Sequence, residues 1–185
     1  MTLSPVLKWL SCPFAVFALI ALTSFLALTA ALSAELALGL EPCILCIYQR
    51  IPFAAALLFS LSGLALCKGR PGRRKSLALK GLLFSNAFVF LINSIIAAYH
   101  TGVERHWWRS MFEGCAVPNL SDEPQTLLEN ILSAPSARCD EIPWADPLFG
   151  LSMANYNVLL CLGLFGLCLA AALMIRPRSG GSPQP

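Results

Sequence analysis

The sequence predicts an all-α membrane protein, a four-transmembrane-helix bundle with a short amphipathic helix in the second of its two external loops. Of the 185 residues, 57% are hydrophobic and only 12% are charged, and the mean hydropathy is +0.68. A soluble domain has about 25% charged residues, so this composition excludes an ordinary soluble protein. The net charge of +3 comes without a basic stripe, which argues against a nucleic-acid-binding protein.

Four charge-free stretches justify the four helices. They cover residues 13–34, 51–67, 81–99 and 151–175, and a helix needs about 20 apolar residues to cross the hydrocarbon core. The second stretch reaches that length if it begins near Cys46, so the expected spans are 13–34, 46–67, 81–99 and 151–175. Loops 35–45 and 100–150 join them, which makes 1–176 a single transmembrane domain. The tail 177–185 is rich in Pro, Gly and Ser and is expected to be disordered.

The first span is expected to remain in the protein. Its apolar run is longer than the core of about 7–15 residues that is typical of a cleaved signal peptide.

The distribution of charge predicts the orientation. Nine basic residues and no acidic ones lie before the first span, in the 68–80 loop and after the fourth span. The other two segments between the charge-free stretches, 35–50 and 100–150, hold all ten acidic residues and the remaining four basic ones, a net charge of −6. Because positive residues stay on the cytoplasmic side, both termini and the 68–80 loop are expected there, and loops 35–45 and 100–150 outside.

The long loop 100–150 contains the predicted amphipathic helix. Asp122 and Gln125 have the spacing of a helix cap. An apolar stripe follows and is expected to lie on the bilayer surface, formed by Leu127, Leu128, Ile131 and Leu132. Aromatic anchors at the interface are expected at Trp107, Trp108 and Trp144.

The predicted topology divides the eight cysteines into two groups. Two lie at cytoplasmic membrane edges and two inside the fourth span, where a thiol behaves as a small hydrophobic group: Cys12, Cys67, Cys161 and Cys168. The other four lie on the external, oxidising side: Cys43, Cys46, Cys115 and Cys139. Only this second group is expected to carry chemistry.

Cys43 and Cys46 form a C-x-x-C motif at the start of the second span. Free backbone N–H groups and the helix dipole stabilise a thiolate at that position. Arg50 follows Cys46 by four residues and so shares its helical face. An arginine is costly in a membrane. We expect Arg50 to stabilise a Cys46 thiolate and to attract an electron-rich acceptor.

Cys115 and Cys139 enclose 23 residues of the long loop. A disulfide between them would stabilise the loop by about 3 kcal/mol in the chain-entropy model. A second pair on the same face also permits thiol exchange between the pairs. Four external cysteines allow three pairings, and the spacing does not choose among them.

The run from Pro42 to Arg50, PCILCIYQR, resembles the signature of the disulfide bond formation protein B (DsbB) family. The segments CDEIPW at 139–144 and LFGLSMA at 148–154 are similar to the family's pattern after its last cysteine. The four spans, the short first external loop and the long second one also match, so the resemblance covers nearly the whole chain.

This resemblance implies a quinone-dependent protein-disulfide oxidoreductase. Such a protein is a multi-pass protein of the bacterial inner membrane whose active loops are periplasmic. Its implied partner is a periplasmic DsbA-like protein with a thioredoxin fold, which it reoxidises. The electrons pass to a membrane quinone, either ubiquinone or menaquinone.

The resemblance also implies catalytic roles for the cysteines. Cys115 would form a mixed disulfide with the partner, and Cys139 would resolve that link and then exchange with Cys43. Cys46, left as a thiolate, would donate to the quinone.

Two further residues are implied in binding the quinone. Arg50 would stabilise the Cys46 thiolate and the charge on the quinone, and His100 matches a histidine near the quinone in the family. Gln49 departs from the pattern, because family members often have Glu there. We expect this change to remove a negative charge beside Arg50.

Two other classes of protein would also use external cysteines. The four of them would form a tetrahedral zinc site in a structural membrane protein, although we expect no metal. Alternatively, simple disulfides would staple a four-span structural or transport subunit, which leaves Arg50 unexplained.

Overall fold

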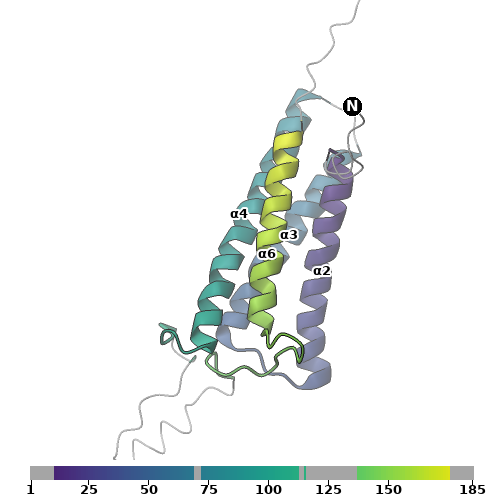
Figure 1. The fold of residues 1–185 in the computed structure, drawn as a ribbon. Helices are drawn as coiled ribbons and strands as arrows, with labels where there is room; N and C mark the ends of the chain where they lie inside the picture. The colour runs from purple at the N-terminus through teal and green to yellow at the C-terminus, as the bar shows by residue number, and fades with distance from the viewer. Residues whose placement is uncertain (1–10, 69–71, 113–114, 116–136, 176–185) are drawn as a thin grey trace, which may run out of the picture.

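The computed structural model describes residues 11–68, 72–112, 115 and 137–175. Four helices make up most of this part of the chain: α2 (Pro13–Leu38), α3 (Ile44–Cys67), α4 (Arg73–Glu104) and α6 (Met153–Met174) (Figure 1). Each is long and apolar enough to cross a membrane. The predicted all-α fold with four transmembrane helices is therefore confirmed. The amphipathic helix predicted within 122–132 and the tail 177–185 lie outside the described residues.

Local sequence explains where the helices begin and end. Pro13 occupies the first turn of α2, where its missing N–H costs nothing, and Gly39 ends that helix in the left-handed conformation at φ 63°. The side chains of Cys43 and Ser152 cap α3 and α6 by accepting backbone N–H bonds from Cys46 and Asn155. Both capping residues lie at the end of the bundle where α3 and α6 begin.

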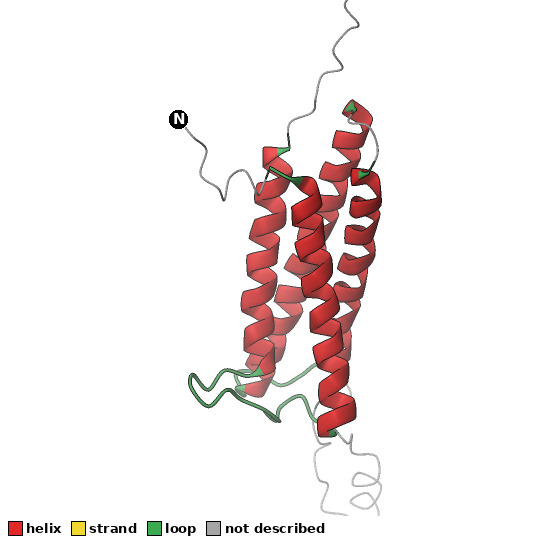
Figure 2. Ribbon diagram, turned by 90° about the vertical axis from the view of Figure 1, so that its right-hand side faces the viewer, coloured by secondary structure: helices red, strands yellow, loops and turns green. Residues whose placement is uncertain are grey.

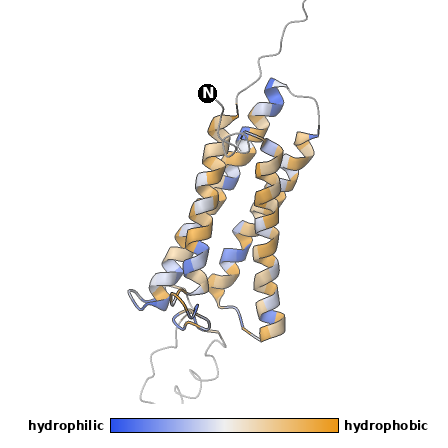
Figure 3. Cartoon of the chain, turned by 45° about the vertical axis from the view of Figure 1, so that its right-hand side comes forward, coloured by the Kyte–Doolittle hydropathy of each residue, from blue (hydrophilic) through white to orange (hydrophobic). Residues whose placement is uncertain are grey.

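The helices run side by side as a bundle (Figure 2). α4 packs against both α3 and α6, and α2 packs mainly on α3. The interior is filled by Phe17, Ile20, Phe53, Leu83 and Phe90. Hydrophobic residues predominate along the helices (Figure 3). Many of their large apolar side chains are exposed, as expected for surfaces that face lipid.

The third helix extends beyond the apolar stretch from which its span was expected. α4 continues to Glu104, so His100 and Glu104 belong to its last turns. Backbone hydrogen bonds carry a helix past the end of its apolar run, which is why hydropathy alone places that end too early. We call the end of the bundle where α2 and α4 end and α3 and α6 begin the cysteine end; the two ends of the described chain lie at the opposite end (Figure 1).

Candidate active site

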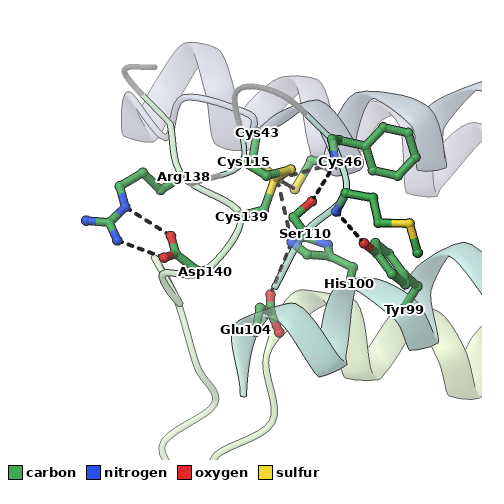
Figure 4. Close-up of a disulfide and its surroundings, with 12 residues drawn as sticks. Cys43, Cys46, Tyr99, His100, Glu104, Ser110, Cys115, Arg138, Cys139 and Asp140 are labelled. Atoms are coloured by element: carbon green, nitrogen blue, oxygen red, sulfur yellow. Dashed lines mark hydrogen bonds and ion pairs between the residues drawn. A yellow bond between two sulfur atoms is a disulfide. The ribbon is translucent and has the colours of Figure 1, made fainter. Parts of the chain in front are cut away.

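The four cysteines that were expected on the external side meet at the cysteine end (Figure 4). Cys43, Cys115 and Cys139 are buried in one apolar cluster with Leu45 and Val103, and Cys46 packs against it. Cys115 and Cys139 form a disulfide. Cys43 and Cys46 are free thiols whose Sγ atoms lie 3.1 Å apart. The structure thus selects one of the three pairings and places a disulfide beside a dithiol.

Cys43 receives several polar contacts. Its Sγ accepts a hydrogen bond from the backbone N–H of Cys46 at 3.4 Å and lies 3.6 Å from Nε2 of His100. The hydrogen bond shared with the Cys46 thiol and the contacts with His100 outweigh the burial, so the pKa of Cys43 lies well below the usual range of a thiol. A thiolate was predicted on Cys46, whereas these contacts favour a thiolate on Cys43.

His100 reaches the cysteines from α4 and is buried. Its Nδ1 lies 2.9 Å from the side-chain nitrogen of Gln49. Its Nε2 faces both Cys43 and Glu104, with 3.7 Å to the Glu104 Oε1 atom. Glu104 is buried as well and accepts a hydrogen bond from the Ser152 hydroxyl. Glu104 was not among the residues predicted from the sequence, although its position four residues after His100 on one helical face was a usable signal.

Gln49 points into the bundle. It is buried, and its Oε1 accepts a hydrogen bond from the side-chain nitrogen of Asn157 on α6. Because its nitrogen contacts His100 on α4, this one side chain joins three helices. From the sequence, Gln49 was discussed only as a neighbour of Arg50, and no role was predicted for Asn157.

Arg50 forms an ion pair with Glu35 of α2. One guanidinium nitrogen, Nη1, makes this contact, and a guanidinium group carries five N–H donors in total. Two apolar side chains of α3 next to Cys46 and Arg50, Ile47 and Ile51, are exposed on the surface. A cation, a thiol and an apolar surface therefore occur together on the first turns of α3, and such a set suits a lipid-soluble acceptor with carbonyl oxygens.

Three residues at the cysteine end have side chains that bind metals in other proteins. The ligand atoms of Cys43, Cys46 and His100 lie within 4.8 Å of one another, but a structural zinc site needs four ligands. A site formed by all four external cysteines would require the Cys115–Cys139 disulfide to be open.

Comparison with known proteins agrees with the geometry. A family model described as disulfide bond formation protein DsbB matches residues 14–171. Disulfide bond formation protein B of Xanthomonas oryzae pv. oryzae (strain MAFF 311018) is 33% identical over 160 residues, covering 80% of this chain and 84% of the relative. The protein of the same name from Xanthomonas campestris pv. campestris (strain 8004) is 37% identical over 139 residues, covering 72% and 75%. That from Haemophilus influenzae is 28% identical over 152 residues, covering 78% and 77%.

Proposed function

Since this chain belongs to the DsbB family and is a disulfide-forming oxidoreductase of the membrane, we propose that it reoxidises a periplasmic DsbA-like protein and passes the electrons to a membrane quinone. The observation that carries the proposal is the burial of a disulfide and a dithiol in one cluster. Two cysteine pairs in contact are what successive disulfide exchange requires.

The cysteine end faces the periplasm, and both termini lie in the cytoplasm of a bacterium whose inner membrane holds the bundle. The charges support this orientation, because the sequence has nine basic residues and no acidic ones before residue 13, in the 68–80 segment and after residue 175. The oxidising compartment is also where a stable disulfide is expected.

The exchange proceeds in balanced steps. A thiolate of the reduced partner attacks Sγ of Cys115, and Cys139 leaves as a thiolate. That thiolate attacks Cys43 of an oxidised Cys43–Cys46 pair, and Cys46 leaves. The partner's second thiol then displaces Cys115, which oxidises the partner.

A last exchange restores the disulfide of the outer pair, Cys115 and Cys139. The freed Cys115 attacks Cys139, and Cys43 leaves as a thiolate. The result is a Cys115–Cys139 disulfide with Cys43 and Cys46 reduced, the same bonding as in the structure.

The quinone, ubiquinone or menaquinone, supplies a two-electron acceptor that returns Cys43 and Cys46 to a disulfide. Cys46 would be the thiol that faces the quinone, and the two electrons would leave when Cys43, released by Cys115, forms the disulfide with Cys46. Arg50 would hold the quinone through N–H groups other than the one that contacts Glu35, next to the apolar surface of α3. His100 acts from inside the bundle, at the dithiol.

Anaerobic mixing of the full-length protein with a reduced thioredoxin-fold partner and a defined quinone tests the proposal. We expect reduction of the quinone, followed by its absorbance, and complete loss of it in Cys46→Ala. Cys115→Ala should block reduction by the partner while a small dithiol still reduces the quinone through Cys43 and Cys46. Unchanged quinone reduction in Cys46→Ala would overturn the mechanism.

A further inference from the structure

A row of polar side chains crosses the apolar interior of the bundle. It begins on α4, where the side-chain nitrogen of Asn93 donates to Sγ of Cys161 at 3.3 Å. Cys161, on α6, in turn donates to Oδ1 of Asn157 at 3.2 Å. Asn93 and Cys161 are completely buried. Cys161 belongs to the apolar core, as expected of a buried thiol, and its thiol also links two asparagines.

The row continues to the dithiol. The nitrogen of Asn157 donates to Oε1 of Gln49, the nitrogen of Gln49 faces Nδ1 of His100 at 2.9 Å, and Nε2 of His100 faces Sγ of Cys43 at 3.6 Å. From Asn93 to Gln49 every donor lies on the side of Asn93 and every acceptor on the side of His100.

The direction of these bonds determines the histidine tautomer. A carboxamide has a donor end and an acceptor end. Because the oxygen of Gln49 is used by Asn157, its nitrogen donates to Nδ1 of His100. A neutral ring that accepts at Nδ1 carries its proton on Nε2, the atom that faces Cys43.

We propose that Cys161 and Asn157 are positioning residues which, through Gln49, hold His100 in the Nε2–H tautomer and so direct a hydrogen-bond donor at Cys43. The thiolate of the fully reduced pair then resides on Cys43, while Cys46 keeps its proton.

The consequence for exchange rests on the proposed function. When Cys115 attacks a Cys139–Cys43 mixed disulfide, the new bond joins Cys115 to Cys139 and Cys43 leaves with the electron pair. A leaving thiolate that is better stabilised leaves faster. The Nε2–H donor therefore promotes restoration of the outer disulfide.

Other titratable groups near Cys43 also affect how well its thiolate is stabilised. On α3 the neighbour is Cys46, and on α4 they are His100 and Glu104, with Arg105 acting on Glu104. The Cys115–Cys139 disulfide packed against Cys43 is uncharged. Glu104 competes with Cys43 for Nε2–H, because its Oε1 lies 3.7 Å from the same nitrogen.

The tautomer can be measured directly, because the chain has only two histidines, His100 and His106. We would label the reduced full-length protein with ¹⁵N-histidine in detergent and assign the signals with His106→Asn, which suits the positive φ of that residue. We expect neutral His100 to carry its proton on Nε2. A wild-type protein with the proton on Nδ1 would overturn the proposal.

Variants of α6 separate positioning from packing. Cys161→Ala should break this row of hydrogen bonds and give a mixture of tautomers. In the acidic range where the thiolate of Cys43 is being lost, Cys43 should then be alkylated roughly fivefold more slowly, the factor expected for one hydrogen bond. Cys161→Ser, which can both donate and accept, should keep the wild-type tautomer and rate. Cys168→Ala is the matched control, because Cys168 is an equally buried cysteine of the same helix, in the apolar core.

An effect of equal size in Cys168→Ala, or no rescue by Cys161→Ser, would assign the change to packing and overturn the proposal. Both readouts require neither partner nor quinone. They therefore remain decisive even if quinone reduction fails, which would count against the proposed function alone.

Discussion

Arg50 of α3 and Glu35 of α2 form an ion pair, with Nη1 of the arginine 2.8 Å from Oε2 of the glutamate. The two side chains are 23% and 37% exposed. An unpaired charge within an apolar helix is costly, and Glu35 offsets that cost by neutralising Arg50 at the cysteine end. The pair also connects the end of α2 to the beginning of α3.

We predict that Arg50→Met lowers kcat/KM for the quinone about tenfold or more, because a charge-assisted donor to the quinone is lost. The exchange between Cys115 and the partner should keep its rate. Steady-state kinetics with varied quinone and trapping of the mixed disulfide measure the two steps.

Glu35→Gln is the matched control for this variant. It breaks the same ion pair but retains the guanidinium, so quinone reduction should persist. A loss as large as in Arg50→Met would mean that the ion pair acts only by holding α2 against α3.

The fold was predictable because the bilayer sets the length of an apolar helix, and four such stretches are visible in the sequence. The meeting of Cys43, Cys46, Cys115 and Cys139 at one end of the bundle was predictable, because the order of the four spans brings loops 35–45 and 100–150 to the same end. The surroundings of His100 were not, because Gln49 and His100 are 51 residues apart and Gln49 and Asn157 are 108 apart. No local pattern reports such contacts, and a buried Cys161 reads as apolar until its neighbours are known.

We predict that Cys43 reacts as a thiolate over an unusually wide pH range. Hydrogen bonds with Cys46 and His100 lower its pKa, so the thiolate persists as the pH falls from neutral and is lost only when the pH passes below that lowered value. The rate of alkylation at Cys43, followed by mass spectrometry, should therefore be nearly constant from neutral to mildly acidic pH.

The denatured protein and His100→Leu provide the comparisons. Denaturation should restore an ordinary thiol, whose rate falls about tenfold for each pH unit below its pKa near 8.5. In His100→Leu one of the stabilising contacts is gone, and the fall in rate should begin at a higher pH than in the wild type. Identical profiles for His100→Leu and wild type would contradict the role given to His100.

We predict that Gly63→Ala destabilises the bundle. A Cβ at Gly63 would lie 2.6 Å from the ring of Phe17, so α2 and α3 would have to move apart, and overpacking of this kind costs about 1–3 kcal/mol. Thermal unfolding in detergent should show a lower Tm. Gly81→Ala in α4, where a Cβ meets nothing within 4 Å, should keep or raise the Tm because alanine favours the helix.

We predict that Gln49→Glu changes the protonation of His100. A carboxylate at this position can only accept, so Nδ1 of His100 must become a donor while Nε2 still faces Cys43 and the carboxylate of Glu104. The ring would then lie between two carboxylates and carry a proton on Nδ1. ¹⁵N-histidine spectra should show the loss of the neutral Nε2–H form.

Glu104→Gln in the same chain should offset the buried negative charge that Gln49→Glu adds beside His100. It leaves one carboxylate beside His100, on the Nδ1 side instead of the Nε2 side, so the total charge around the ring returns to that of the wild type. The double variant should therefore be more stable to heat than Gln49→Glu alone. Additive losses of Tm from the two substitutions would show that residues 49 and 104 do not act on His100 together.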